Sequence, residues 1–241
     1  MKTPDERLPG KEAIGGIFQE ETKYSPGRMG GHYLDWEKMP ERYKSYPEST
    51  PRICLPAAKL SPDAGLWETI LRRRSVREYS RNTALPLETL SVLLWATQGI
   101  TAEAGGFQLR SAPSAGALYP IETYIMARAV EGLQQGVYHF RPYAFDLEFI
   151  RPGDFSQALA QAALGQDMAA DAQIAFIWSA IVERSRWKYR QRAYRYIYLD
   201  AGHIAQNLYL AGTAMGLGVC GMGAFYDNLV NELIGVDGKE E

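Results

Sequence analysis

The chain has 241 residues, of which 46% are hydrophobic and 22% are charged, and its formal net charge is -2. These values are typical of a globular protein that can bury a sizeable core, and they disfavour a general nucleic-acid-binding protein, which usually carries a basic surplus. Two widely separated cysteines form neither a disulfide framework nor a zinc pattern, and the sequence shows no secretory leader and no apolar run that would span a bilayer, so we expect a cytoplasmic protein.

Residues 1–56 are rich in proline, glycine and charge and lack sustained periodicity. They predict an irregular N-terminal extension that wraps a main domain at residues 57–241. Gly30-Gly31 marks a turn in this extension. The aromatic residues of the extension are expected to anchor it to the main domain.

Two helices are predicted next. Ser61-Pro62-Asp63 has the residue types of a helix start, and this helix is expected to run to about Arg73. The second helix is expected to start at Pro86, with leucines on one face, and to stop at Gly99.

The stretch Arg72 to Tyr79, which follows the first helix, contains four arginines and a serine. One interpretation is a solvated basic end of that helix. The other is an anion site. Alternate residues of an extended segment point to one side, so Arg73, Ser75 and Arg77 could converge on a phosphate, which suits the guanidinium fork.

The central part of the chain predicts a loop followed by strands. Residues 105–120 have a loop composition, and the small residues of Ser114 to Ala117 suit either a plain surface loop or close approach of the backbone to a ligand. Strands are expected at residues 121–128 and in a hairpin at 137–150, and a short helix is expected at 155–164. Residues 172–181 form a continuous apolar run that predicts a strand covered on both faces.

The last part of the chain predicts helices and a glycine-rich turn. A long helix with one basic, solvated face is expected from Val182 onward, and Ile204 to Met215 is expected to be a helix that is buried on most sides. Gly216 to Gly221 matches the spacing of a dinucleotide fingerprint, but it follows a helix and precedes a predicted strand, so we reject a Rossmann site. His203 is expected to be structural, and a final helix is predicted at residues 226–234. This irregular alternation favours an α+β sandwich.

Several of these segments occur together and in one order in a known family. They are Arg73-Arg74-Ser75-Val76-Arg77, Ser114-Ala115-Gly116-Ala117-Leu118-Tyr119-Pro120, Trp187-Lys188-Tyr189, Tyr194-Arg195-Tyr196, Leu199-Asp200-Ala201-Gly202-His203 and Gly216-Leu217-Gly218. The chain resembles the SagB-type dehydrogenases of the FMN-dependent nitroreductase superfamily over about residues 60 to 241. Each motif is weak alone, and the specificity lies in the ordered set.

The resemblance implies a nitroreductase-like three-layer sandwich, with a central, mainly antiparallel sheet and helices on both faces. It also implies a homodimer with FMN at the subunit interface. The residues that would bind FMN are Arg73, Ser75, Arg77, Pro113, Ser114, Ala115, Gly116, Gly218, Cys220, Gly221, Met222 and Gly223. Relatives continue into a final strand beyond a segment like residues 235–241, which we expect this chain to lack.

The resemblance also implies a catalytic pair, Lys188 and Tyr189. Oxidation of an azoline to an azole removes a proton from carbon and delivers a hydride to flavin N5. Lys188 would be the base, because burial and the neighbouring cations of residues 184–192 favour the uncharged amine that a base needs. Tyr189 would orient Lys188 or the substrate.

Three functions stay open. The first is a SagB-type dehydrogenase that acts on a heterocyclic peptide or small molecule, and a cyclodehydratase and a peptide substrate are its expected partners. The second is an NAD(P)H-dependent nitro- or quinone reductase. The third is a flavin-binding or scaffold subunit without turnover. No metal site, nucleic-acid partner or membrane partner is expected.

Overall fold

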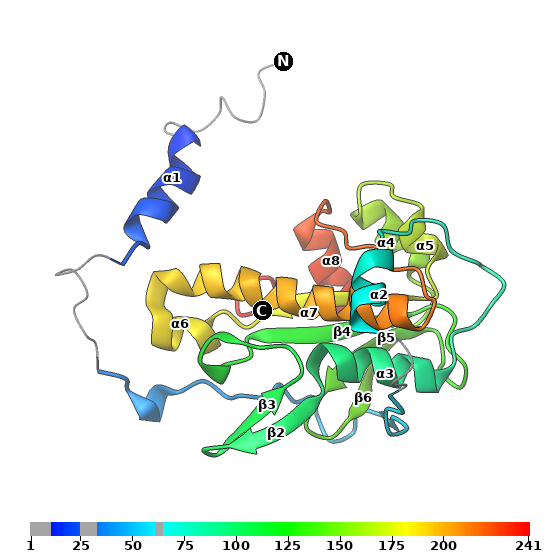
Figure 1. Cartoon of the computed structure of the whole chain (residues 1–241). Helices are drawn as coiled ribbons and strands as arrows, with labels where there is room; N and C mark the ends of the chain where they lie inside the picture. Colours follow the sequence, from blue (N-terminus) through cyan, green and yellow to red (C-terminus); the bar gives the residue numbers. More distant parts are fainter. Residues whose placement is uncertain (1–10, 25–32, 61–64) are drawn as a thin grey trace.

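The structure, a computed structural model, describes residues 11–24, 33–60 and 65–241 (Figure 1). Its strands are β1 (Arg52–Cys54), β2 (Ile100–Ala104), β3 (Phe107–Arg110), β4 (Ile121–Ala127), β5 (Gly136–Arg141), β6 (Asp146–Pro152) and β7 (Ile174–Ala180). Its α-helices are α1 (Lys11–Glu21), α2 (Leu66–Arg72), α3 (Leu87–Gln98), α4 (Ser156–Ala162), α5 (Met168–Asp171), α6 (Glu183–Tyr189), α7 (Ala193–Ala214) and α8 (Asp227–Ile234). Short 3-10 helices occupy Trp36–Lys38, Ala115–Ala117 and Arg190–Arg192.

The described strands form one antiparallel sheet in the order β1-β6-β5-β4-β7 and a separate β2–β3 hairpin. The strand predicted at residues 121–128 is β4, and the hairpin predicted at residues 137–150 is the β5–β6 pair. Both predictions are confirmed. β4 lies inside the sheet and all its residues are buried, so it forms the centre of the core.

Helices cover both faces of this sheet. Alternate residues of a strand point to opposite faces, and on β4 the residues Ile125 and Ala127 pack with α3 and with Leu208 of α7. Tyr124 and Met126 point the other way and pack with α4, α5 and α8. The chain is therefore a three-layer α+β sandwich with a central antiparallel sheet, as predicted.

The predicted helices are largely confirmed. α2 ends at Arg72, close to the predicted end, whereas the start predicted at Ser61-Pro62-Asp63 lies outside the described residues. Pro86 is the N-cap of α3 and Gly99 is its C-cap. The helices predicted at residues 155–164 and 226–234 are α4 and α8, and glycines with positive φ follow both.

The predicted loop at residues 105–120 is wrong in part, because Phe107–Arg110 is strand β3. It pairs with β2 across a two-residue turn, Gly105-Gly106, in which both residues have positive φ. Two positive φ values are what a tight hairpin turn requires, and glycine adopts them without strain. The glycine pair is therefore a hairpin signal that the loop prediction overlooked, while residues 111–120 stay outside the strands.

The strand predicted at residues 172–181 exists as β7, and both of its faces are covered as predicted, since Phe176 and Trp178 pack with the core on the α3 side and Ala175 and Ile177 pack with the core on the α4 side. Among the described residues β7 is an edge strand that pairs only with β4, and every one of its residues is half-buried. An apolar run therefore does not by itself distinguish a central strand from an edge strand.

The long helix predicted from Val182 is broken. α6 ends at Tyr189, Arg190 has a φ of 52° and a ψ of -135°, and α7 starts at Ala193. The prediction that Ile204 to Met215 is buried on most sides is also wrong, because along this segment only Ile204, Leu208 and Gly212 are buried. α7 buries one stripe and leaves its other sides partly open to solvent.

The N-terminal extension contacts the main domain at several described points. Arg192 donates a hydrogen bond to the carbonyl of Thr22, Trp187 donates to that of Asp35, and Arg184 donates to that of Glu41. The turn predicted at Gly30-Gly31 lies outside the described residues. None of the helices in the described ranges combines the length and the apolar character needed to cross a bilayer.

Candidate functional site

The extended segment after α2 lies beside the glycine-rich turn after α7. Ser75 forms a parallel bridge with Val219, and the N–H of Val76 donates to the carbonyl of Val219 at 3.0 Å. Tyr209 joins the two segments, because its hydroxyl lies 3.1 Å from Ser75 Oγ and accepts a hydrogen bond from the Gly221 N–H. We call Arg73, Ser75, Arg77, Tyr209 and Gly218 to Gly221 the arginine cluster.

Two arginines of this cluster have no carboxylate partner among the described residues. The guanidinium of Arg73 lies 5.3 Å from the centre of the Tyr209 ring, and Arg77 donates only a long hydrogen bond of 3.4 Å to the Ser75 carbonyl. By contrast, Arg72 pairs with Glu68 one turn away, and Arg74 donates to the carbonyls of Leu71 and Arg73. Arg73 and Arg77 are therefore the available cations for an anionic ligand.

The glycines of the turn permit close packing. A Cβ on Gly218 would lie 2.8 Å from Val76 Cγ1, so a side chain there would separate the two segments of the arginine cluster. Gly216 has a φ of 71°, which favours glycine. Cys220 is half-buried, and Met222 packs toward α4, α5 and α8. The strand predicted after Gly216 reduces to the single bridge at Val219.

A second group of predicted residues forms around the loop before β4. Asp200 of α7, which is only 4% exposed, accepts hydrogen bonds from Ser114 Oγ at 2.5 Å and from the Ala115 N–H at 3.3 Å. Ser114 Oγ also accepts the N–H of Tyr119 at 3.0 Å. Burial raises the pKa of Asp200, although the hydrogen bonds from Ser114 and Ala115 oppose this effect. The carboxyl group thus ties the loop to α7.

The predicted catalytic pair reaches the same loop. A Cβ on Gly116 would lie 2.6 Å from the Tyr189 hydroxyl and 2.9 Å from Lys188 Nζ, so both side chains would have to shift to admit one. We call Pro113 to Gly116, Lys188, Tyr189 and Asp200 the lysine cluster.

Several residues in or next to the lysine cluster have positive φ values. Ala117, Tyr119 and Arg190 have φ values of 54°, 46° and 52°, which side chains rarely adopt. Gly116, which precedes Ala117 and lies against Lys188 and Tyr189, has a φ of 66°. Such strain persists only where the surroundings fix the backbone, and it is concentrated at functional sites.

Three of the cations expected around Lys188 contact other groups. Arg184 is buried and points into the sheet, Arg186 pairs with Glu183, and Arg192 donates to the hydroxyl of Tyr196. The near neighbour of Lys188 is instead the ring of Tyr189, whose centre is 5.4 Å from Nζ. Burial raises the pKa of the Tyr189 hydroxyl, so this group stays a neutral hydrogen-bond donor.

A buried ion network in the sheet contacts the start of α6. His139 of β5 is 1% exposed, and its ring nitrogens lie 3.0 Å from a Glu148 oxygen and 2.8 Å from a Glu122 oxygen. Glu122 also accepts a hydrogen bond from Arg184, in the first turn of α6. Because both ring nitrogens face carboxylates, both must donate, and His139 is an imidazolium cation. The network thereby fixes the helix that carries Lys188.

The pKa values in the network agree with this charge state. Burial alone would lower the pKa of His139, but its hydrogen bonds to Glu122 and Glu148 outweigh burial and raise it. Burial would raise the pKa of Glu122, but His139 and Arg184 outweigh it and lower this pKa to about 2. Each of these shifts favours the charged form of its group.

The two clusters are not brought together within one chain. Asp200 and Tyr209 lie nine positions apart on α7, which corresponds to about 13 Å along the axis and to about half a turn in rotation. The lysine cluster lies near the first half of α7, beside α6, whereas the arginine cluster lies near its second half, beside α2 (Figure 1).

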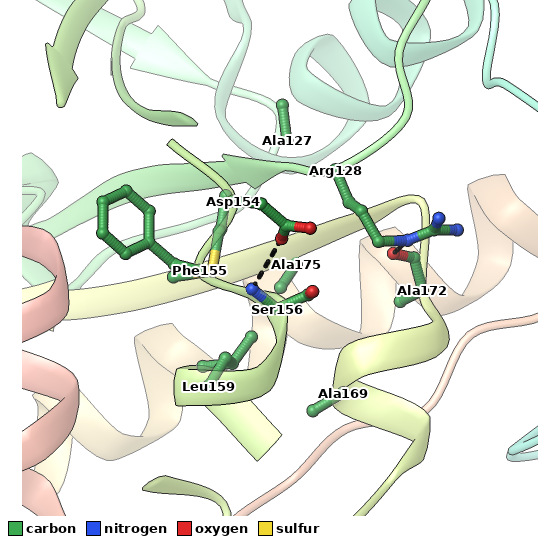
Figure 2. A pocket seen from close by; sticks show the side chains of 10 residues that line it. Ala127, Arg128, Asp154, Phe155, Ser156, Leu159, Ala169, Ala172 and Ala175 are labelled. Atoms are coloured by element: carbon green, nitrogen blue, oxygen red, sulfur yellow. Dashed lines mark hydrogen bonds between the residues drawn. The ribbon is translucent and has the colours of Figure 1, made fainter. Parts of the chain in front are cut away.

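Two small pockets bear on the position of the site. One touches the lysine cluster and is lined by Pro113, Ser114 and Asp200, among others. The other, between the end of β4 and helices α4 and α5, contains none of the predicted site residues (Figure 2). In that pocket the Asp154 carboxylate accepts the Ser156 N–H (Figure 2). Arg128 donates to the carbonyls of Asp171 and Ala172. The polar groups there serve local structure.

Sequence reasoning did not assign two residues that organise these clusters, Asp200 and Tyr209. Asp200 lies inside a motif of the resemblance, which was its available signal, whereas Tyr209 carries none. In the described parts of the chain, no group of His, Cys, Asp and Glu could hold a metal ion.

Sequence comparisons agree with the resemblance at the level of the nitroreductase family. Residues 70–241 match the model of the nitroreductase family. A protein of Methanocaldococcus jannaschii that is named as a nitroreductase is 41% identical over 70% of this chain and 83% of its own length. The trifolitoxin-processing protein TfxB of Rhizobium leguminosarum bv. trifolii is 32% identical over 64% of this chain, and the microcin B17-processing protein McbC of Escherichia coli is 31% identical over 53%.

The matched region is only part of some relatives. It spans 44% of TfxB and 49% of McbC, so the chain corresponds to less than half of either protein. Among solved structures, a crystal structure from Anabaena variabilis that is described as a nitroreductase superposes with a TM-score of 0.73 and 32% identity, over 93% of this chain and 43% of that one. The E. coli microcin synthetase complex McbBCD has a chain with the same fold, with a TM-score of 0.58 and 22% identity.

Proposed function

The chain belongs to the nitroreductase family, and from this premise we propose that it is an FMN-dependent oxidoreductase of the SagB type. Its substrate would be an azoline-like heterocycle in a peptide or a small molecule. The observation that carries this proposal is the meeting of Lys188 and Tyr189 at Gly116, because a general base and a hydroxyl then face one backbone position. We also propose that the protein is located in the cytoplasm.

The residues present fit an FMN molecule chemically. The arginine cluster offers the guanidinium groups of Arg73 and Arg77 beside the hydroxyls of Ser75 and Tyr209, which suits a phosphate with a polyhydroxyl chain. The lysine cluster offers a loop of small residues, against which a flat ring can lie. Bound FMN would supply the hydride acceptor.

A second copy of the chain would complete each site. The arginine cluster and the lysine cluster lie on opposite sides of α7, so one ligand meets both only if they come from different subunits. α2 leaves Leu66, Trp67, Ile70 and Leu71 exposed, which suits a subunit interface rather than solvent. We therefore propose a homodimer that pairs the arginine cluster of one subunit with the lysine cluster of the other.

Trp67→Glu is expected to convert the dimer to a monomer, because Trp67 is 81% exposed and a carboxylate would become buried at the interface. FMN affinity should fall when the dimer is lost, since each site would then lack the residues that the other subunit supplies. Sedimentation velocity and FMN titration at one protein concentration measure both effects. Leu164→Glu is the control, because Leu164 follows α4 on the other face of the sheet. If Trp67→Glu stays dimeric and binds FMN with unchanged affinity, the proposed interface is contradicted.

The chain's own residues would divide the reaction between them. Lys188 Nζ would take a proton from one ring carbon, and the electron pair of that C–H bond would form the new ring double bond. The adjacent carbon would lose a hydride, for which bound FMN would be the two-electron acceptor. Tyr189, as a neutral donor, would hold the substrate at the Gly116 backbone. The ion network that includes Arg184 would keep α6 in register with the loop.

Arg73→Ala is expected to raise the dissociation constant of FMN about tenfold or more, because charge-assisted hydrogen bonds are worth about 1.5–3 kcal/mol. Riboflavin lacks the phosphate and should bind as before. Quenching of flavin fluorescence on titration measures both constants. Arg72→Ala is the matched control, since Arg72 is satisfied by Glu68. Equal losses in the two variants would remove Arg73 from the phosphate site.

The names of two relatives favour a peptide substrate, because they are processing proteins for trifolitoxin and microcin B17. A cyclodehydratase and a leader-bearing peptide are the corresponding proposed partners. Rapid bleaching of bound flavin by NADH or NADPH would instead favour a nitro- or quinone reductase. A purified protein that is colourless and takes up no FMN would favour a scaffold subunit and would refute both enzyme proposals.

A further inference from the structure

The hydrogen bonds around Ser114 change what this predicted cofactor ligand can do. Its hydroxyl hydrogen is donated to Asp200 Oδ2 at 2.5 Å, and its oxygen accepts the Tyr119 N–H at 3.0 Å. The Ala115 N–H is likewise used by Asp200 Oδ1 at 3.3 Å. A hydroxyl has one hydrogen to donate, so neither Ser114 Oγ nor the Ala115 N–H is left to donate to a ligand.

The hydrogen bonds of Asp200 connect a helix, α7, to a loop that contains residues with positive φ. Asp200 is buried on α7, where the helix fixes its position, and it binds across 86 positions of sequence to Ser114. The loop that it holds contains Gly116 and Ala117 with φ values of 66° and 54°. A strained loop persists only where contacts over-determine it. The two oxygens of one carboxylate supply such contacts at consecutive residues.

We propose that Asp200 is a positioning residue for flavin binding, which holds the Ser114 to Gly116 backbone in the shape that receives the flavin ring. This inference rests on the proposed function and deepens it. Asp200 does not touch the ligand. Its role is to occupy the polar groups of Ser114 and Ala115 internally, so that the loop presents small side chains and the Gly116 backbone to the ring while Lys188 and Tyr189 close behind it.

Asp200→Ala is expected to raise the dissociation constants of FMN and riboflavin by one common factor, of about tenfold to a hundredfold, because the loop would face the ring that both flavins share. Asp200→Asn is the conservative variant. Its amide oxygen can accept the Ala115 N–H and its amide nitrogen can donate to Ser114 Oγ, so it should bind both flavins within about fivefold of the wild type. Asp154→Ala is the matched control, since Asp154 accepts the Ser156 N–H at the start of α4, away from both clusters.

Fluorescence titrations with FMN and riboflavin on the full chain, with visible circular dichroism of the bound flavin, test this proposal. Loss of the wild-type dichroism in Asp200→Ala and its return in Asp200→Asn would support it, since a role in stability alone would lower the thermal midpoint and leave both observables unchanged. If Asp200→Ala does not fold, weak binding of both flavins by Ser114→Ala supports the proposal and wild-type binding overturns it.

Failure of this proposal differs from failure of the proposed function. Wild-type protein that binds neither flavin would refute both. Wild-type protein that binds both flavins, together with an Asp200→Ala variant of equal affinity, would overturn only the role of Asp200. A loss confined to FMN would also overturn it, because that pattern belongs to the phosphate contact of Arg73.

Discussion

His139→Leu is expected to lower the free energy of unfolding by about 3–5 kcal/mol, because the substitution removes one partner of a buried ion network and leaves its neighbours uncompensated. Glu148 is fully buried and Glu122 nearly so. Without the imidazolium, Glu122 keeps Arg184, whereas Glu148 keeps, among the described residues, only longer contacts to the Tyr46 N–H at 3.4 Å, to Arg52 at 3.5 Å and to Arg141 at 3.8 Å. Urea denaturation at fixed protein concentration and pH 6 measures the loss.

The stability difference between wild type and His139→Leu should depend on pH in a defined way. The pKa of His139 is raised in the folded chain, so its contribution is complete below the ordinary value of 6.5 and is lost as pH rises through the folded value. The pKa of Glu122 is lowered to about 2, so its contribution is complete above its ordinary value of 4.5 and is lost as pH falls toward 2. The difference should therefore be largest between about pH 4.5 and 6.5.

The prediction that His203 is structural is wrong, because this residue is exposed and makes no hydrogen bond among the described residues, so it provides the control for His139→Leu. His203→Leu removes a histidine from the surface of α7 and should change the free energy of unfolding by less than about 0.5 kcal/mol. A difference for His139→Leu that stays below about 1 kcal/mol at every pH would contradict a charged His139.

Lys188→Ala is expected to lower the rate of substrate oxidation by about a hundredfold to ten thousandfold, the usual contribution of a positioned general base. FMN should stay bound, because the proposed phosphate contacts belong to Arg73 and the proposed loop support to Asp200. A thiazoline-4-carboxamide peptide is a suitable probe, and its anaerobic reduction of the bound flavin can be followed by absorbance in a stopped-flow instrument.

The matched control is Arg186→Ala, which removes a cation two positions away on the same helix. Arg186 is exposed and paired with Glu183, so its loss should leave the rate of flavin reduction almost unchanged. Tyr189→Phe should fall between the two, since it keeps the ring beside Tyr196 and loses the hydroxyl at Gly116. Full turnover by Lys188→Ala with bound FMN would show that another group removes the proton.

The sequence determined the local elements of the fold. Pro86 and Gly99 mark the two ends of α3. Proline suits the start of a helix because it has no N–H that needs a partner there, and glycine is common at the end. Two short runs of strand-forming residues, 137–140 and 146–150, with the connection 141–145 between them, predicted the β5–β6 hairpin, because such a hairpin forms between near neighbours in sequence. The ordered motifs likewise indicated the family that the matched region of 70–241 establishes.

The tertiary structure decided which distant residues meet. Ser114 contacts Asp200 and Ser75 contacts Tyr209 across 86 and 134 positions of sequence, and no periodicity encodes such pairs. The charge of His139 likewise depends on strand register, which places Glu122 and Glu148 on either side of it. The half-turn between Asp200 and Tyr209 on α7 separates the two clusters, because one helix presents opposite faces to different surroundings.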